Sequence, residues 1–310
     1  MKNKKIKFLI YIIFYLFFLN TGHAKENKIL FKIDNDIITS LDILNEIKYL
    51  NIINKKLLIN TSDKEIFEIA KNSLVREKIK EIELLKHVKE IKIEEKYLDS
   101  ILLGYFKEYK INSKLEFEKY FSNFELDPKN IEKKLTIEIL WNQLIYQKFH
   151  KNIKINKDTI KSNILSSKNL KEYLLSEIFF DVQENENLDD KYLKIKNNIN
   201  NSSFSEAALF FSTSNSANNG GDLGWIKETS IDKKILNRIN SINVGEYTTP
   251  ITVPGGFLIL KINDIKISKI KNDTKKEFDL IVKKKTNDQL NQFSNVYFNK
   301  IKKNIQINEL

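Results

Sequence analysis

The sequence has 310 residues, of which 41% are hydrophobic and 30% are charged, and its formal net charge is +11. This length allows two domains with ample cores, and the composition is ordinary for a soluble globular protein. The chain contains no cysteine, which excludes disulfides, thiolate nucleophiles and thiolate metal sites.

The first 24 residues have the parts of a secretory signal peptide. Four lysines between positions 2 and 7 precede an uninterrupted apolar run at 8–19, and small residues at positions 22 and 24 suit a cleavage site after Ala24. A membrane span needs roughly 20 apolar residues, so the run predicts a cleaved leader rather than an anchor. No later segment is apolar enough to span a bilayer. The mature protein is therefore expected in the periplasm.

Without the four leader lysines the net charge is +7. A basic surface can bind nucleic acid, but export argues against that partner and no nucleic-acid motif occurs. His23 lies in the leader, and His87 and His150 have no second histidine at ligand spacing. We therefore expect no metal site and no cofactor.

The first half of the mature chain predicts one strand region followed by helices. Residues 29–39 alternate and are rich in isoleucine, which indicates a strand, or a strand pair with a turn. Capping boxes at Ser62–Glu65 and Ser113–Glu116 and an Asp127-Pro128 pair mark helix starts. Residues 40–167 are therefore expected to be almost wholly helical.

The pattern changes near residue 172. Residues 173–264 predict a strand, two helices, a loop at 212–225, a short helix, and two strands joined by a turn. Residues 274–303 return to a helix, and a strand at 305–307 is predicted to pair with the strand at 29–33. The fold class is thus α+β.

Four features in order give the segment 173–264 its resemblance to the parvulin family of peptidyl-prolyl isomerases. They are Gly-Gly-Asp-Leu-Gly-Trp at 220–225, the helix at 204–208, Val-Gly-Glu at 244–246 with Thr-Pro-Ile at 249–251, and the strand at 256–264. One such string is weak, but the order and spacing together are specific.

The order of elements around this segment resembles the SurA-type periplasmic chaperones, whose familiar form has two parvulin domains, whereas this chain has room for one. The resemblance implies a signal peptide at 1–24, a helical chaperone domain at 29–167 and a parvulin-like domain at 173–264. It also implies that a C-terminal helix and strand at 270–310 pack on the N-terminal domain.

The parvulin resemblance implies an apolar proline pocket at Leu223, Ile231 and Ile235, although three aliphatic core residues are an equally simple interpretation. The loop motif serves fold geometry. Gly220 and Gly221 suit positive φ, Asp222 bonds local amides, and Trp225 is a core or edge anchor.

The polar positions implied by the resemblance depart from the family. Glu177 and Leu258 stand where parvulins usually carry histidines, and Ser214 falls near the family's cysteine or aspartate. A leucine side chain has no hydrogen-bonding group. The catalytic residues are thus unknown, and the resemblance implies little isomerase activity.

Three functions remain open. The favoured one is a chaperone that binds unfolded or nascent outer-membrane polypeptides, the second is an active prolyl isomerase, and the third is a structural or assembly protein. Aromatic residues of the helical part are candidates for a client groove, although core packing is the more common role of such residues. They are Tyr105, Phe106, Phe117, Tyr120, Phe121, Phe124, Trp141, Tyr146 and Phe149.

Overall fold

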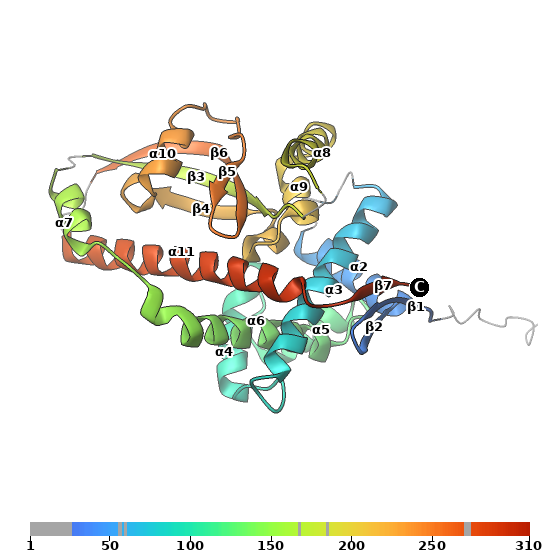
Figure 1. Ribbon diagram of the computed structural model, residues 1–310. Helices are drawn as coiled ribbons and strands as arrows, with labels where there is room; N and C mark the ends of the chain where they lie inside the picture. The colour runs from blue at the N-terminus through green and yellow to red at the C-terminus, as the bar shows by residue number, and fades with distance from the viewer. Residues whose placement is uncertain (1–26, 55–57, 59–60, 167–168, 184–185, 270–273) are drawn as a thin grey trace, which may run out of the picture.

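The computed structural model describes residues 27–310 apart from short gaps at 55–57, 59–60, 167–168, 184–185 and 270–273. The expected leader lies outside the described residues. Figure 1 shows one sheet with its helices at the top, a group of helices with a small sheet below and to the right, and the long helix α11 (Thr274–Lys302) between them.

A three-stranded antiparallel sheet joins the two ends of the described chain. Strand β1 (Ile29–Ile33) pairs with β2 (Asp36–Thr39) on one edge and with β7 (Ile307–Glu309) on the other. Phe31 and Ile33 of β1 are fully buried in the core beneath. The expected pairing of the chain ends is confirmed, with the last strand starting at residue 307 rather than 305.

In the described part of the chain six helices follow the first hairpin, and several of them begin at a side-chain cap. Ser62 Oγ accepts from Glu65 N while the Glu65 carboxylate accepts from Ser62 N, which forms a full capping box. Asp127 caps the helix that opens on Pro128. The helices are α2 (Ser40–Ile53), α3 (Asp63–Leu85), α4 (Glu95–Tyr105), α5 (Lys114–Ser122), α6 (Pro128–Phe149) and α7 (Lys157–Ser166), with single turns η1 (Lys107–Tyr109) and η2 (His150–Asn152).

The second sheet is antiparallel in the order β4-β3-β6-β5. The strand period of two divides its core between two faces. Ile178 and Phe180 of β3 pack beneath α8 and α9, whereas Leu175 and Phe179 face the other way, toward α10. The elements are β3 (Asn169–Phe180), β4 (Asp222–Lys227), β5 (Ile251–Val253), β6 (Gly256–Lys269), α8 (Leu188–Asn201), α9 (Phe204–Phe211), α10 (Lys233–Ile239), η3 (Asn215–Asn219) and η4 (Glu228–Ser230).

Two expectations about this sheet are wrong in detail. The sequence pattern placed residues 222–225 in a loop. In the structure they begin the edge strand β4, and antiparallel pairing with β3 fixes their register. Strands β3 and β6 also run beyond 173 and 264, pairing as far as Asn169 and Lys269. Asparagine, glutamate and lysine residues weaken the strand signal in these two extensions, and the pairing between β3 and β6 holds both of them extended.

Helix α11 packs on both parts of the molecule. On one side Trp141 Nε1 of α6 donates to Ser294 Oγ at 2.8 Å, in a buried contact. On the other side Asn299 Nδ2 donates to Gly255 O at 3.0 Å, and Lys285 Nζ donates to Ser230 O at 2.9 Å. Helix α11 therefore packs mainly on the N-terminal helices, as expected, and in addition bonds to the parvulin-side residues Gly255 and Ser230.

These features establish an α+β fold, with a helical module completed by α11 and an antiparallel-sheet domain inserted into it. Among the helices in the described ranges, we find none with the length and apolarity that crossing a membrane requires.

Candidate functional site

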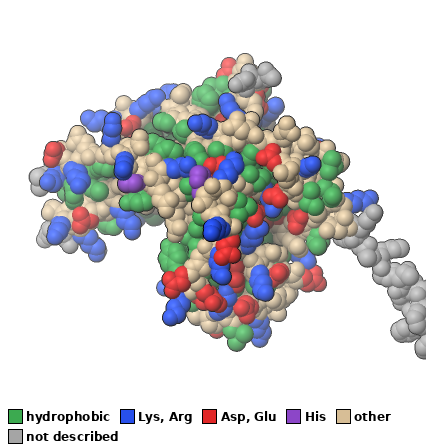
Figure 2. All heavy atoms as spheres, turned by 60° about the horizontal axis from the view of Figure 1, so that its bottom comes forward, with side chains coloured by type: hydrophobic (Ala, Val, Ile, Leu, Met, Phe, Trp, Pro, Cys, Tyr) green, Lys and Arg blue, Asp and Glu red, His purple; other side chains and the backbone are tan. Residues whose placement is uncertain are grey.

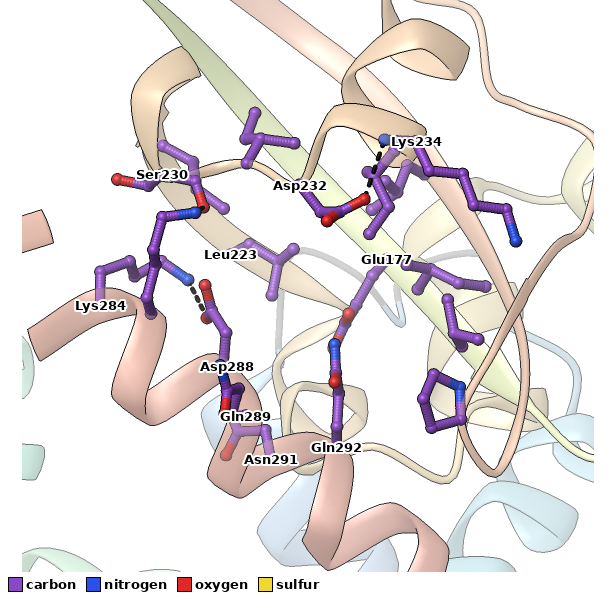
Figure 3. A pocket seen from close by; sticks show the side chains of 18 of the residues that line it. Glu177, Leu223, Ser230, Asp232, Lys234, Lys284, Asp288, Gln289, Asn291 and Gln292 are labelled. Atoms are coloured by element: carbon purple, nitrogen blue, oxygen red, sulfur yellow. Dashed lines mark hydrogen bonds and ion pairs between the residues drawn. The ribbon is translucent and has the colours of Figure 1, made fainter. Parts of the chain in front are cut away.

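A cavity of about 830 Å³ lies between the β3 face of the second sheet and helix α11. Its floor comes from β3, β4, α10, β5 and β6, and its opposite wall comes from residues 284–295 of α11 and residues 154–160 before and within α7. Figure 3 shows Glu177 and Leu223 pointing from the sheet into this space and α11 running along its other side.

The floor is aliphatic. Leu223 on β4, Ile231 after η4 and Ile235 on α10 all line the cavity, and Leu258 on β6 lies beside them. Leu258 is buried, and it pairs across the strands with Phe179. The structure thus brings together the three residues expected to form an apolar pocket. It also places beside them Leu258, whose side chain cannot form a hydrogen bond.

A chain of hydroxyl groups leads to the carboxylate in the cavity. Ser212 Oγ and Ser214 Oγ lie 2.9 Å apart, and Ser214 Oγ and Ser216 Oγ lie 2.7 Å apart. Ser216 Oγ donates to Glu177 Oε1 at 2.7 Å. Glu177 and Ser214 were both candidate polar positions, whereas Ser212 and Ser216 were not identified. Their only signal in the sequence is the alternation of serines at 212, 214 and 216.

Burial in the cavity raises the pKa of Glu177 above its ordinary value of 4.5, and the hydrogen bonds from Ser216 and Ser214 offset part of that shift. Lys284 and Asp288 across the cavity act in opposite directions, the lysine lowering the Glu177 pKa and the aspartate raising it. These two α11 side chains form an ion pair with each other. Glu177 therefore holds its proton to a higher pH than a solvated glutamate does.

Glu177→Gln is expected to raise the free energy of unfolding at neutral pH. A raised folded-state pKa stabilises the protein below the unfolded-state pKa, and this contribution is lost as the pH rises through the folded-state value. The neutral glutamine avoids the burial of a charge, so its advantage should shrink as the pH falls toward 4.5. Urea denaturation of both proteins across this range measures the difference.

Glu81→Gln is the control, because the pKa of Glu81 is shifted in the opposite direction to that of Glu177. Burial raises the pKa of Glu81, but hydrogen bonds from Lys133 and Lys78 outweigh burial and lower it overall. Glu81→Gln should therefore be less stable than the wild type at neutral pH, and the deficit should vanish at acid pH. Equal pH profiles for the two variants would contradict the assignment of Glu177.

The Gly-Gly-Asp motif shapes the loop that carries the serines. Gly220 and Gly221 both have positive φ, at 61° and 78°, and a Cβ on Gly221 would lie 2.1 Å from Glu177 O. Asp222 Oδ1 accepts from Gly224 N at 2.9 Å. Trp225 lies on the edge strand, 38% exposed, with Lys266 Nζ 3.9 Å from its ring centre. None of the residues Gly220, Gly221, Asp222 and Trp225 lines the cavity.

The helical module holds this loop from behind. Arg76 of α3 donates from Nη1 to Ser212 O at 2.6 Å and from Nη2 to Asn218 Oδ1 at 2.9 Å. Asn54 Nδ2 donates to Asn218 O at 3.0 Å. Burial lowers the pKa of the Arg76 guanidinium, which nevertheless stays charged. The serine loop is therefore fixed by residues of both parts of the chain.

The cavity has the chemistry of a ligand-binding site. It combines an aliphatic floor with a few placed polar groups, as ligand sites commonly do. Within the described ranges there is no group of three or more His, Cys, Asp or Glu side chains arranged to hold a metal ion. The polar atoms available to a ligand are thus hydroxyl, amide, ammonium and carboxylate groups.

Comparison with known proteins identifies the sheet domain. The PPIC-type PPIASE (rotamase) domain matches residues 177–264. Chaperone SurA of Pseudomonas aeruginosa is 36% identical over 61 residues, which are 20% of this chain and 15% of that protein. Periplasmic chaperone PpiD of Haemophilus influenzae is 34% identical over 68 residues, which are 22% of this chain and 11% of that protein.

A solved structure from Campylobacter jejuni, from work that describes PEB4 and Cj1289 as SurA-like chaperones, aligns with 92% of this chain and 99% of its own. The identity is 18% and the TM-score is 0.37. The domain match and the two sequence relatives carry the assignment. Residues 177–264 are a PPIC-type parvulin domain, and the chain is similar to SurA and PpiD over a stretch that spans less than a sixth of the length of either protein.

Proposed function

We propose that this protein is a periplasmic chaperone that binds unfolded outer-membrane polypeptides and has little or no prolyl isomerase activity. The observation that carries the proposal is the cavity, which keeps an aliphatic floor but has no histidine among its lining residues. Such a site can hold a peptide segment without having the groups that promote rotation of its proline bond.

Rotation of an X-Pro bond requires no covalent chemistry, but its barrier is roughly 18–20 kcal/mol because the amide is conjugated. A catalyst must favour the twisted amide over the planar one. Leu258 cannot donate a hydrogen bond, and Glu177 already accepts one from Ser216. Neither side chain is therefore well placed to stabilise the twisted amide by a hydrogen bond.

Client binding is supported by aromatic side chains at the surface of the helical module. Of the nine aromatic candidates, Phe106, Phe117, Phe121 and Trp141 are fully buried core residues. Others remain exposed, and Figure 2 shows hydrophobic patches between the charged side chains on one face of the molecule. Exposed apolar patches often mark interaction sites. The exposed candidates are Tyr105, Phe124 and Tyr146.

The proposed compartment follows from the sequence of the first 24 residues, which has the three parts of an export signal. Cleavage after Ala24 would release the chain into the periplasm, which is the compartment named in the relative periplasmic chaperone PpiD.

An active isomerase is the second candidate, and the serine chain that ends on Glu177 favours it. Two measurements on the full mature chain separate the functions. Light scattering after dilution of a urea-unfolded outer-membrane β-barrel protein should show suppressed aggregation. NMR exchange spectroscopy on a proline tetrapeptide should show little acceleration, although the uncatalysed reaction is slow enough, at tens to hundreds of seconds, to reveal modest catalysis.

Strong acceleration that is lost in Ile231→Ala or Ile235→Ala would establish the isomerase and overturn the proposed division of roles. Failure to suppress aggregation would remove the chaperone function and leave the structural or assembly role. Crosslinking of the tagged chain in envelope extract would then show whether it contacts unfolded outer-membrane proteins at all.

A further inference from the structure

Helix α11 presents two chemically different faces. Leu290, Phe293 and Tyr297 pack with the core around Trp141 of α6. The spacing of i, i+3, i+4 and i+7 places a second set on one common face, and all its members line the cavity of the parvulin domain. This set, termed the amide face, comprises Asp288, Asn291, Gln292 and Asn295.

The composition of this stretch differs from that of the chain. Residues 286–299 contain six asparagines and glutamines and a single charged residue, Asp288, although 30% of the whole chain is charged. Lysines flank the stretch at 283–285 and at 300, 302 and 303. A helix face that met only solvent would commonly carry such charges, so the uncharged amides suit a different neighbour.

The amides on this face are free to bind a ligand. Within the described part of the chain, the side chains of Asn291, Gln292 and Asn295 make no hydrogen bond. Gln289, one position away, contrasts with them because both its amide atoms bond the backbone of Lys154, at 2.9 and 2.7 Å. Figure 3 shows the Gln292 side chain directed toward Glu177, across the cavity.

Across the cavity from the amide face lies the aliphatic floor formed by Leu223, Ile231 and Ile235. A ligand that satisfies both walls needs hydrogen-bonding groups along one side and an apolar group on the other. Each primary amide offers two donors and an acceptor, which match the C=O and N–H groups of a peptide. An extended polypeptide places its backbone and alternate side chains in this relation.

We propose that the amide face of α11 and the parvulin floor form one two-walled peptide site. The amides of Asn291, Gln292 and Asn295 bind the backbone of an extended segment, and the floor receives one aliphatic or proline side chain. Recognition then depends on the backbone and on one apolar residue, so the site accepts many sequences. This inference rests on the proposed chaperone function and specifies which groups of the cavity bind the client polypeptide.

The test uses the full mature chain and a fluorescein-labelled peptide, Gly-Ser-Ala-Leu-Pro-Ala-Ser-Gly, followed by anisotropy. The triple variant Asn291→Leu, Gln292→Met, Asn295→Leu keeps side-chain size but removes the amides. We expect it to bind the peptide at least about tenfold more weakly, since each lost hydrogen bond weakens binding by about two- to tenfold. Asn287→Leu is the matched control, because Asn287 is exposed on α11 and does not line the cavity.

A second peptide, N-methylated at both alanines, lacks two backbone N–H donors and so tests whether the site binds the peptide backbone. It should bind the wild type about three- to tenfold more weakly than the parent peptide, and the triple variant should not distinguish the two. Equal affinity of the wild type for both peptides, or unchanged affinity of the triple variant, would overturn the two-walled site.

These results are separable from those that decide the proposed function. If the wild type suppresses aggregation and binds the peptide but the amide variant binds equally well, the inference is wrong and the chaperone function stands. If the wild type neither suppresses aggregation nor binds the peptide, the proposed function fails and the inference fails with it.

Discussion

Trp141→Ala is expected to lower the free energy of unfolding by about 3–5 kcal/mol, which is the usual cost of removing a large buried aromatic side chain. Trp141 is fully buried, donates to Ser294 Oγ and lies 5.8 Å from the ring of Tyr297 and 6.3 Å from that of Phe298. It is therefore the main anchor of α11 on the helical module. Urea denaturation followed by far-UV circular dichroism measures the loss.

The second tryptophan of the chain provides the control. Trp225 is 38% exposed on an edge strand and contacts Lys266, so Trp225→Ala should cost about 1 kcal/mol or less. Similar losses for the two variants would show that α11 is not anchored through Trp141. Because α11 forms one wall of the cavity, the Trp141 variant should also bind peptide more weakly.

Arg76→Ala is expected to lower the free energy of unfolding by about 3 kcal/mol. Hydrogen bonds from charged groups contribute about 1.5–3 kcal/mol, and the substitution leaves the Ser212 carbonyl and the Asn218 side chain without their donor. The same change should loosen the serine loop. Hydrogen exchange of residues 212–218 in the full chain should become faster, beyond what the global loss of stability explains.

Lys78→Ala is the matched control for Arg76. Lys78 lies on the same helix and pairs with Glu81 and Asp36 rather than with the parvulin domain. Its removal should cost about 1 kcal/mol or less and leave exchange in the loop unchanged. Arg76→Lys should fall between wild type and Arg76→Ala, because a lysine keeps the charge but not the fork of two donors. Unchanged loop exchange in Arg76→Ala would disprove the clamp.

Helix starts were predictable because their chemistry is local. Ser62, Ser113 and Asp127 all act as N-caps at the positions that the sequence indicated, and a capping residue needs only neighbours three positions away. The pairing of the chain ends also followed from two short isoleucine-rich stretches. These signals depend on side-chain period and on short-range hydrogen bonds.

The rest of the site depends on contacts between distant segments. Strand β4 was missed because Gly224 and Asp222 are poor strand formers, and only pairing with β3 holds them extended. Arg76 is separated from Ser212 by 136 positions, so no local pattern links them. The helical spacing of the amide face of α11 can be found in the sequence, but its position over the cavity depends on the tertiary structure.

The strand pairing of the chain ends has a consequence for the order of folding. Gln306 N donates to Asp34 Oδ1 across 272 positions, so a chain synthesised from its N-terminus releases β1 long before its β7 partner exists. Among the described residues, the strands of the parvulin sheet pair only with one another, so this sheet can fold as a unit meanwhile. The helical module, whose residues emerge first, is thus closed only after α11 and β7 have emerged, and the apolar surfaces that these two elements cover stay open until then.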